Sequence, residues 1–173
     1  VALCRAGHAP TVFEMAATAG GRARRVTHRG QAFDNGQHIL IGAYTATLGL
    51  MAELGVDPAQ VLARLPLTLR YPDGRGLRLP GGPAALAFVR GVLGARGWTL
   101  RERLALLAAA AGWARRGFRC APTLSVQGLC AGLPPRVVAD LIEPLCVAEL
   151  NTPADEASAA VWLRVLRDAL FAG

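Results

Sequence analysis

Apolar side chains recur along the chain with two different periods, and these periods predict its elements. From Ile39 to Leu54 they follow helical spacing, and Gly55 ends the helix because glycine adopts the left-handed conformation cheaply. Alternating runs on both sides of Pro72-Asp73-Gly74, within "LTLRYPDGRGLRLP", predict a β-hairpin. Helical patterns then fill the rest of the chain, over 83–93, 99–115, 137–145 and 153–170.

Polar residues beside these patterns mark several helix starts. Asp57 is an N-cap, with Pro58 at the first position of a short helix. Thr99 and Glu102 have the spacing of a capping box. Thr152, followed by Pro153, is the predicted cap of the last helix.

The first thirty residues have a different texture, with short segments and many small residues. We expect a helix end over 1–6 with a stop at Gly7, a short buried strand "TVFE" ending in Glu14, and a small-residue turn over 16–21. Short strands should follow over 25–28 and 31–33. A helix, a strand ending in an acid and a glycine turn match the second half of a βαβ dinucleotide unit.

Four residues of this region are therefore candidates for binding a nucleotide. An acid at the strand end can accept hydrogen bonds from a ribose, which is the hypothesis for Glu14. Gly20 and Gly21 would let the backbone approach a diphosphate, with Arg22 supplying charge. The alternatives are that Glu14 is a solvent-facing acid, that the two glycines form an ordinary tight turn, and that Arg22 is a surface charge.

The change of texture near residue 64 predicts two parts and an α/β fold. Residues 1–63 form a nucleotide-binding part that lacks a first strand and its glycine fingerprint, and 64–173 form a mainly helical substrate part with the hairpin. The chain begins without Met, as a helix ends, and stops at another helix end. We therefore expect a fragment of a larger two-domain protein.

Composition and charge narrow the class of protein. The chain is 53% apolar and 18% charged, which is typical of a globular protein. All its basic residues are arginine, and the net charge of +7 favours an anionic partner such as a nucleotide or an acidic membrane surface. Nucleic acid is disfavoured because the arginines are scattered and aromatic residues make up only 6%.

The cysteines and the apolar runs indicate the cellular compartment of the protein and its relation to membranes. The four cysteines lack metal-ligand spacing, so we expect no metal site and reduced thiols in the cytoplasm. The most apolar run, Leu104 to Trp113, is too short to cross a bilayer. Arginines within the apolar segment 83–119 suit either a peripheral contact with anionic lipid or a core helix with a solvated basic face. Its aromatic residues, Phe88, Trp98, Trp113 and Phe118, suit either the wall of an apolar tunnel or a core.

Three blocks of the sequence carry a resemblance to known families. "VFEMAATAGGRARRV" resembles the second conserved block of the FAD-dependent amine oxidase and phytoene desaturase group. "FDNGQHILIGAYTATLGLMAELG" and "EPLCVAELNTPADEASAAVWLRVLRDAL" resemble hydroxysqualene dehydroxylase, the squalene-associated FAD-dependent desaturase of bacterial hopanoid synthesis. The resemblance runs across almost the whole chain, without the upstream glycine fingerprint and the downstream segment that closes the FAD site.

The resemblance implies a Rossmann-like FAD domain interleaved with a substrate domain, and FAD as cofactor. It implies that Glu14 holds the adenosine ribose, that Gly20, Gly21 and Arg22 lie along the diphosphate, and that Gly36, Gln37 and His38 line the flavin ring. The implied reaction replaces the hydroxyl of hydroxysqualene by hydrogen to give squalene.

An acid should help that hydroxyl to leave, and Asp34 and His38 are the candidates for the acid and its orienting partner. The alternatives are that His38 caps a helix and Asp34 caps a turn. For the whole protein, the alternatives are another flavoenzyme of the group, such as a carotenoid desaturase or an amine oxidase, and a non-catalytic lipid-binding remnant.

Overall fold

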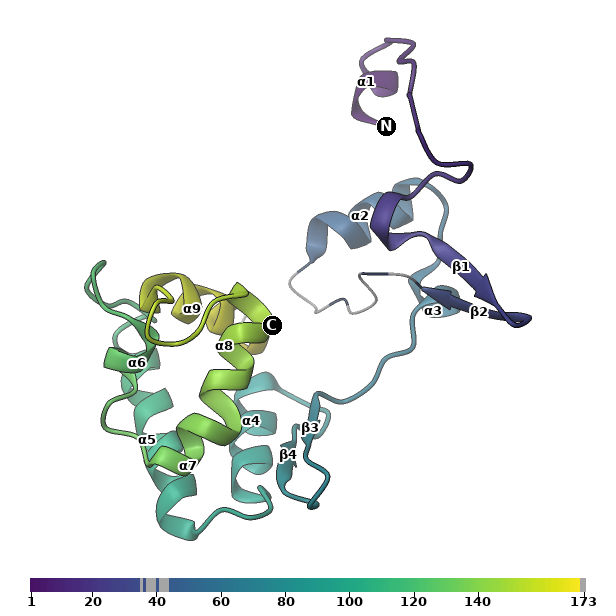
Figure 1. The fold of residues 1–173 in the computed structure, drawn as a ribbon. Coiled ribbons are helices and arrows are strands. Elements are labelled where there is room, and N and C mark those ends of the chain that lie inside the picture. Colours follow the sequence, from purple (N-terminus) through teal and green to yellow (C-terminus); the bar gives the residue numbers. More distant parts are fainter. Residues whose placement is uncertain (35, 37–39, 41–43, 172–173) are drawn as a thin grey trace. The chain divides into compact units, whose positions relative to one another are not determined.

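The computed structural model describes residues 1–34, 36, 40 and 44–171. The chain divides into two compact units, Val1–Ile41 and Gly42–Gly173, built from helices and short antiparallel strands (Figure 1). This division reflects compactness rather than ligand binding, so the functional boundary near residue 64 remains a prediction.

The first unit opens with the short helix α1 (Ala2–Arg5) and a glycine stop. Gly7 has φ 82°, its N–H donates to the carbonyl of Cys4 at 3.1 Å, and the N–H of His8 donates to the carbonyl of Leu3 at 3.0 Å. These two bonds form the Schellman motif that closes a helix on a left-handed residue. The predicted stop at Gly7 is confirmed.

The predicted buried strand over 11–14 is wrong. These residues have no regular structure, and Val12 and Phe13 are 84% and 91% exposed. A strand exists only when a neighbouring strand takes up its main-chain hydrogen bonds, and none of the described residues pairs with this segment. The segment has the apolar side chains that are typical of a strand, but no strand among the described residues pairs with it.

The two following strands are confirmed. The turn η1 (Gly21–Ala23) leads into β1 (Arg25–His28), which pairs with β2 (Gln31–Asp34) in the register Arg25↔Asp34 to His28↔Gln31. Arg29 and Gly30 between them both have positive φ, 50° and 77°, as a tight hairpin turn requires.

The second unit begins with α2 (Thr45–Glu53) and α3 (Pro58–Val61). Gly55 has φ 72° and ends α2 as predicted. The predicted start at Ile39 lies outside the described residues, but Leu40 and Tyr44 are described and not helical, so the prediction of a helix from Ile39 is wrong before Thr45. Asp57 accepts a hydrogen bond from the N–H of Ala59 at 2.9 Å, which confirms it as the cap of α3.

The hairpin and the next two helices also follow the prediction. Strands β3 (Thr68–Arg70) and β4 (Gly76–Arg78) are antiparallel, and α4 (Ala84–Leu93) and α5 (Leu100–Arg115) follow them (Figure 1). Thr99 and Glu102 form the expected capping box at the start of α5.

The C-terminal helices differ from the prediction in extent. A short helix α6 (Val126–Leu129), capped by Ser125, was not predicted. The helix expected over 137–145 runs longer, through α7 (Pro135–Val137), the π-helical segment η2 (Val138–Ile142) and α8 (Glu143–Leu150). The last helix is α9 (Ala159–Leu166), which continues into the π-helical segment η3 (Arg167–Phe171).

The predicted cap at Thr152 and helix start at Pro153 are wrong. Asn151 ends α8 in the left-handed conformation, and the hydroxyl of Thr152 donates back to the carbonyl of Leu150. The backbone at 157–159 instead pairs with 124–126, through Val126 N–H to Ala157 at 2.9 Å and Ala159 N–H to Leu124 at 2.9 Å. Because of this pairing, the last helix begins only at Ala159.

The core of the second unit lies among α4, α5, α8 and α9. Trp113 and Trp162 meet edge to face with ring centroids 5.6 Å apart, and both are at most 5% exposed. Trp98 belongs to the same core, and Phe88 and Phe118 pack against it, so the core interpretation of these aromatic residues holds for this structure. No described helix has the length and apolar character needed to cross a bilayer.

Candidate functional site

The carboxylate proposed to bind the ribose is accessible. Glu14 is exposed, and its Oε1 accepts a hydrogen bond from the N–H of Ala16 at 2.8 Å. This bond fixes the side chain at the start of the turn, and Oε2 has no partner among the described residues. A fixed carboxylate with one free oxygen is suited to accept a hydrogen bond from a hydroxyl group.

The glycine pair adopts the backbone conformation for which glycine is needed. Gly20 and Gly21 have φ of 115° and 55°, in the left-handed region that a side chain disfavours. A Cβ at Gly20 would lie 3.1 Å from the Cβ of Arg24, whereas one at Gly21 would meet nothing within 4 Å. Arg22 is exposed and makes no ion pair with a described residue. Open backbone beside a free guanidinium fits the diphosphate of a dinucleotide in residue type and exposure.

The residues proposed for the ring side are only partly described. Asp34 ends β2 with an exposed side chain, and Gly36 has φ 100°. Gln37 and His38 lie outside the described residues.

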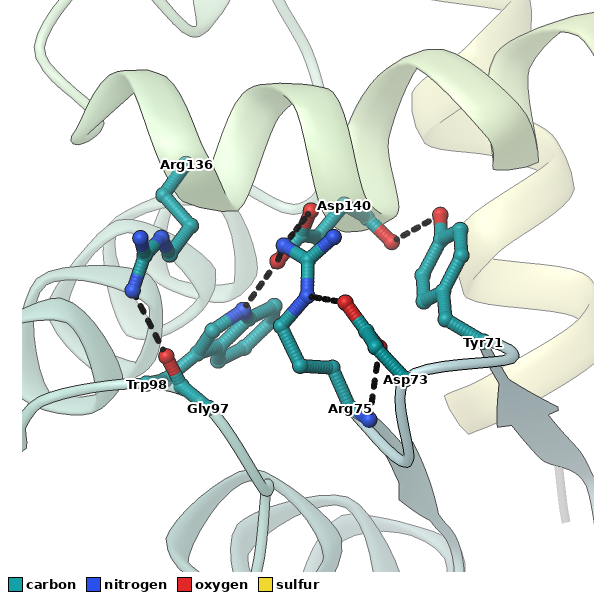
Figure 2. A network of polar contacts seen from close by, with 7 residues as sticks. All are labelled: Tyr71, Asp73, Arg75, Gly97, Trp98, Arg136 and Asp140. Atoms are coloured by element: carbon teal, nitrogen blue, oxygen red, sulfur yellow. Dashed lines mark hydrogen bonds and ion pairs between the residues drawn. The ribbon is translucent and has the colours of Figure 1, made fainter.

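The most ordered polar cluster was not anticipated from the sequence. Asp140 in η2 is 8% exposed, and it accepts hydrogen bonds from Arg75 and Trp98 (Figure 2). Arg75 Nη1 lies 2.9 Å from Oδ1 and 3.0 Å from Oδ2, and Trp98 Nε1 lies 3.1 Å from Oδ2. A buried carboxylate with three charge-assisted contacts ties the hairpin and the segment before α5 to the long helix.

The main chain of Asp140 takes part in the same cluster. Pro144 has no N–H to donate to the carbonyl four residues before it, which belongs to Asp140. The hydroxyl of Tyr71 donates to this carbonyl at 2.9 Å, as Figure 2 shows. Burial raises the pKa of Tyr71 above its ordinary value, and the nearby charge of Asp140 adds to the shift. The Asp-x-x-x-Pro spacing was the one signal in the sequence that the carbonyl of Asp140 would lack its usual donor within the helix.

Arg75 is shared between two carboxylates. Besides Asp140, it forms an ion pair through Nε with Asp73, whose carboxylate also accepts the N–H of Arg75 at 3.0 Å. These hydrogen bonds, first from the backbone and then from the guanidinium, hold the pKa of Asp73 below its ordinary value. Both carboxylates of the cluster, Asp73 and Asp140, are therefore already paired with Arg75. The role of the cluster is to hold the hairpin in place.

A hollow of about 340 Å³ opens beside the hairpin. It is lined by β3, β4, the turn between them and the residues after α4. Arginine supplies four of its lining residues, and the lining contains no acid; the arginines are Arg70, Arg75, Arg78 and Arg96. Within the part of the chain that the structure describes, no group of three or more His, Cys, Asp and Glu residues could hold a metal ion.

Comparison with models of known families places the chain in one of them. The model of a family described as flavin containing amine oxidoreductase matches residues 1–170, which covers nearly all of both units. No curated protein matches the chain.

Proposed function

The chain belongs to the family of flavin-containing amine oxidoreductases, which makes the protein an FAD-dependent oxidoreductase, and we propose that it converts hydroxysqualene to squalene. The observation that carries the proposal is the pair of blocks at 33–55 and 143–170, which resemble hydroxysqualene dehydroxylase in order and spacing. In the structure the second block forms α8, the left-handed Asn151 and α9, and contributes Cys146, Trp162 and Leu163 to the core.

The first unit would hold the cofactor through its adenosine end. Glu14 would accept a hydrogen bond from the ribose at its free Oε2, and the backbone at Gly20 and Gly21 would face the diphosphate beside Arg22. Gly36, Gln37 and His38 would line the ring. When bound and reduced, FAD supplies the hydride that the reaction needs.

The chain itself would supply the proton and the dry surroundings. Loss of an allylic hydroxyl requires a proton on the departing oxygen, and we assign this task to Asp34 and His38, one as acid and the other as its orienting partner. Asp34 stands at the end of β2, where an exposed carboxylate can reach a neighbouring group. A dry apolar pocket would exclude water from the carbon that loses oxygen.

The substrate is a long hydrocarbon that dissolves in membranes, so we place the protein in the cytoplasm, in peripheral contact with the inner face of the membrane. Exposed apolar residues on α4 and α5 support this contact, namely Leu86, Val89, Leu93, Leu100 and Leu104. Exposed arginines accompany them on the same helices, as a surface for anionic lipid requires.

Product analysis tests the proposed reaction. Protein expressed from the complete reading frame and reduced under anaerobic conditions should convert hydroxysqualene to squalene, and should leave a carotenoid precursor unchanged. Desaturation of the carotenoid precursor without formation of squalene would assign the protein to another branch of the family.

Two substitutions test the acid. Asp34→Asn and His38→Ala should each lower turnover about a hundredfold, within the usual range for loss of a positioned acid or base. Flavin content is measured in both variants and should stay unchanged in Asp34→Asn, because Asp34 is not assigned to the cofactor. Full turnover in His38→Ala would remove that residue from the reaction.

A further inference from the structure

We propose that the hollow beside the β3–β4 hairpin is a binding site for a phosphate-bearing anion. The site lies in the second unit and uses none of the residues assigned to the flavin. Its support comes from strand pairing, from the charges of its walls and from the absence of acids in its lining.

The strand register gathers arginines on one face of the hairpin. Side chains alternate between the two faces along a strand, so Leu69 and Leu77 share one face, and Leu77 on that face is only 8% exposed. Arg70 and Arg78 lie on the opposite face, and both are exposed. Their positions are diagonal across the ladder, about 7–8 Å apart, which is within reach of long side chains.

A third arginine joins this face through the residues after α4. The backbones of Gly76 and Arg96 exchange two hydrogen bonds, Arg96 N–H to Gly76 at 2.8 Å and Gly76 N–H to Arg96 at 3.2 Å. Gly76 also pairs with Arg70 on its other side. The order across the ladder is therefore Arg70, Gly76, Arg96, and Gly76 places no side chain between the two arginines.

The arginine charges around this hollow are only partly compensated by the described residues. Arg75 at its edge is satisfied by Asp73 and Asp140, whereas Arg70, Arg78 and Arg96 form no ion pair with any described residue. Like charges held close together destabilise a folded protein unless a counter-ion joins them. Three guanidinium groups without an ion-pair partner line one hollow, and they therefore favour the binding of an anion with more than one charge.

Phosphate is the anion that these groups suit best. A guanidinium is a planar fork that binds two oxygens of a phosphate at once, and its charge does not titrate. A volume of about 340 Å³ is at the small end of ligand pockets, which favours a phosphate or diphosphate group over a whole nucleotide. The group could be carried by a phospholipid or by a soluble compound, and both present the same chemistry.

Titration calorimetry with inorganic diphosphate, at constant ionic strength, tests the site on protein from the complete reading frame. Arg70→Gln and Arg96→Gln should each weaken binding about tenfold, the usual effect of losing one charge-assisted hydrogen bond. Arg115→Gln is the matched control, because it removes an exposed guanidinium of α5 outside the hollow and should leave binding unchanged. The thermal midpoint of the ligand-free variants should not fall, since relief of like-charge repulsion offsets the substitution.

A second arm separates the two sources of phosphate. Vesicles of phosphatidylglycerol and phosphatidylcholine, compared with phosphatidylcholine alone, should bind the protein through Arg70 and Arg96 if the ligand is a lipid headgroup. Binding of diphosphate without such vesicle binding assigns the site to a soluble phosphate. Equal binding of both ligands by wild type, Arg70→Gln and Arg96→Gln overturns the proposal, as does loss of bound flavin in these variants. A protein that binds diphosphate here but makes no squalene keeps this site and refutes only the proposed reaction.

Discussion

Asp140→Asn removes one charge from the cluster that fastens the hairpin, with little change of shape. Both carboxylate oxygens accept a hydrogen bond from Arg75, and Oδ2 also accepts one from Trp98. An amide can present only one oxygen, so either orientation turns an NH2 group towards an N–H donor. The variant therefore loses at least one hydrogen bond to a charged group and creates a clash of donors.

The size of the effect follows from these contacts. A hydrogen bond to a charged group contributes about 1.5–3 kcal/mol, and a buried donor without a partner costs about 1–3 kcal/mol. Breaking a fully buried ion pair costs about 3–5 kcal/mol, but Arg75 is 36% exposed and keeps Asp73, which lowers the expected loss. We expect Asp140→Asn to lower the free energy of unfolding by about 2–4 kcal/mol.

Urea unfolding followed by tryptophan fluorescence measures this loss, because Trp98 is one of the partners and reports on its own surroundings. Asp73→Asn is the matched control: its carboxylate is exposed and, among the described residues, hydrogen-bonds only to Arg75, so the loss should be clearly smaller than for Asp140→Asn. An equal effect of the two substitutions, or an effect of Asp140→Asn below about 0.5 kcal/mol, would refute the view that Asp140 anchors the hairpin.

Three further predictions concern the helices, the hairpin and pH. Thr99→Ala removes the capping box with Glu102 and should lower the free energy of unfolding by about 1 kcal/mol in the same urea assay, whereas Thr99→Ser should restore most of it. Gly76→Ala should destabilise by about 2 kcal/mol or more, since φ is 133° and the new Cβ would strike the carbonyl of Leu69; a well-folded, equally stable variant would contradict the hairpin geometry. Burial raises the pKa of the Cys130 thiol to about 12, above its unfolded value, so its stabilising contribution is complete below about pH 9 and is lost as pH rises towards 12. Unfolding measured from pH 8 to 11 should show this decline, and Cys130→Ala should reduce it.

Local signals in the sequence predicted local structure well. Gly7 and Gly55 end helices, and Asp57 and Thr99 begin them, because each acts through hydrogen bonds to residues at most five positions away. The hairpin around Asp73 was predictable for the same reason. Such interactions are encoded in a short window of the chain.

The failures share a dependence on distant partners. The segment 11–14 has the side chains of a strand and lacks a pairing strand among the described residues. The segment 153–158 has helix-start signals, but the backbone at 157–159 pairs with 124–126 instead. The cluster at Asp140 draws on Arg75 and Trp98, which are 65 and 42 positions away. Periodicity cannot reveal such pairs, since it describes one element at a time.

Flavin binding by the first unit is the central claim, and titration with FAD tests it most directly. Protein from the complete reading frame should bind FAD, and Glu14→Ala should weaken binding about tenfold or more through loss of charge-assisted hydrogen bonds to the ribose. Glu149→Ala, which removes an exposed carboxylate from the second unit, should leave the affinity unchanged. Equal affinities of wild type and Glu14→Ala would contradict the assignment of this carboxylate to the cofactor.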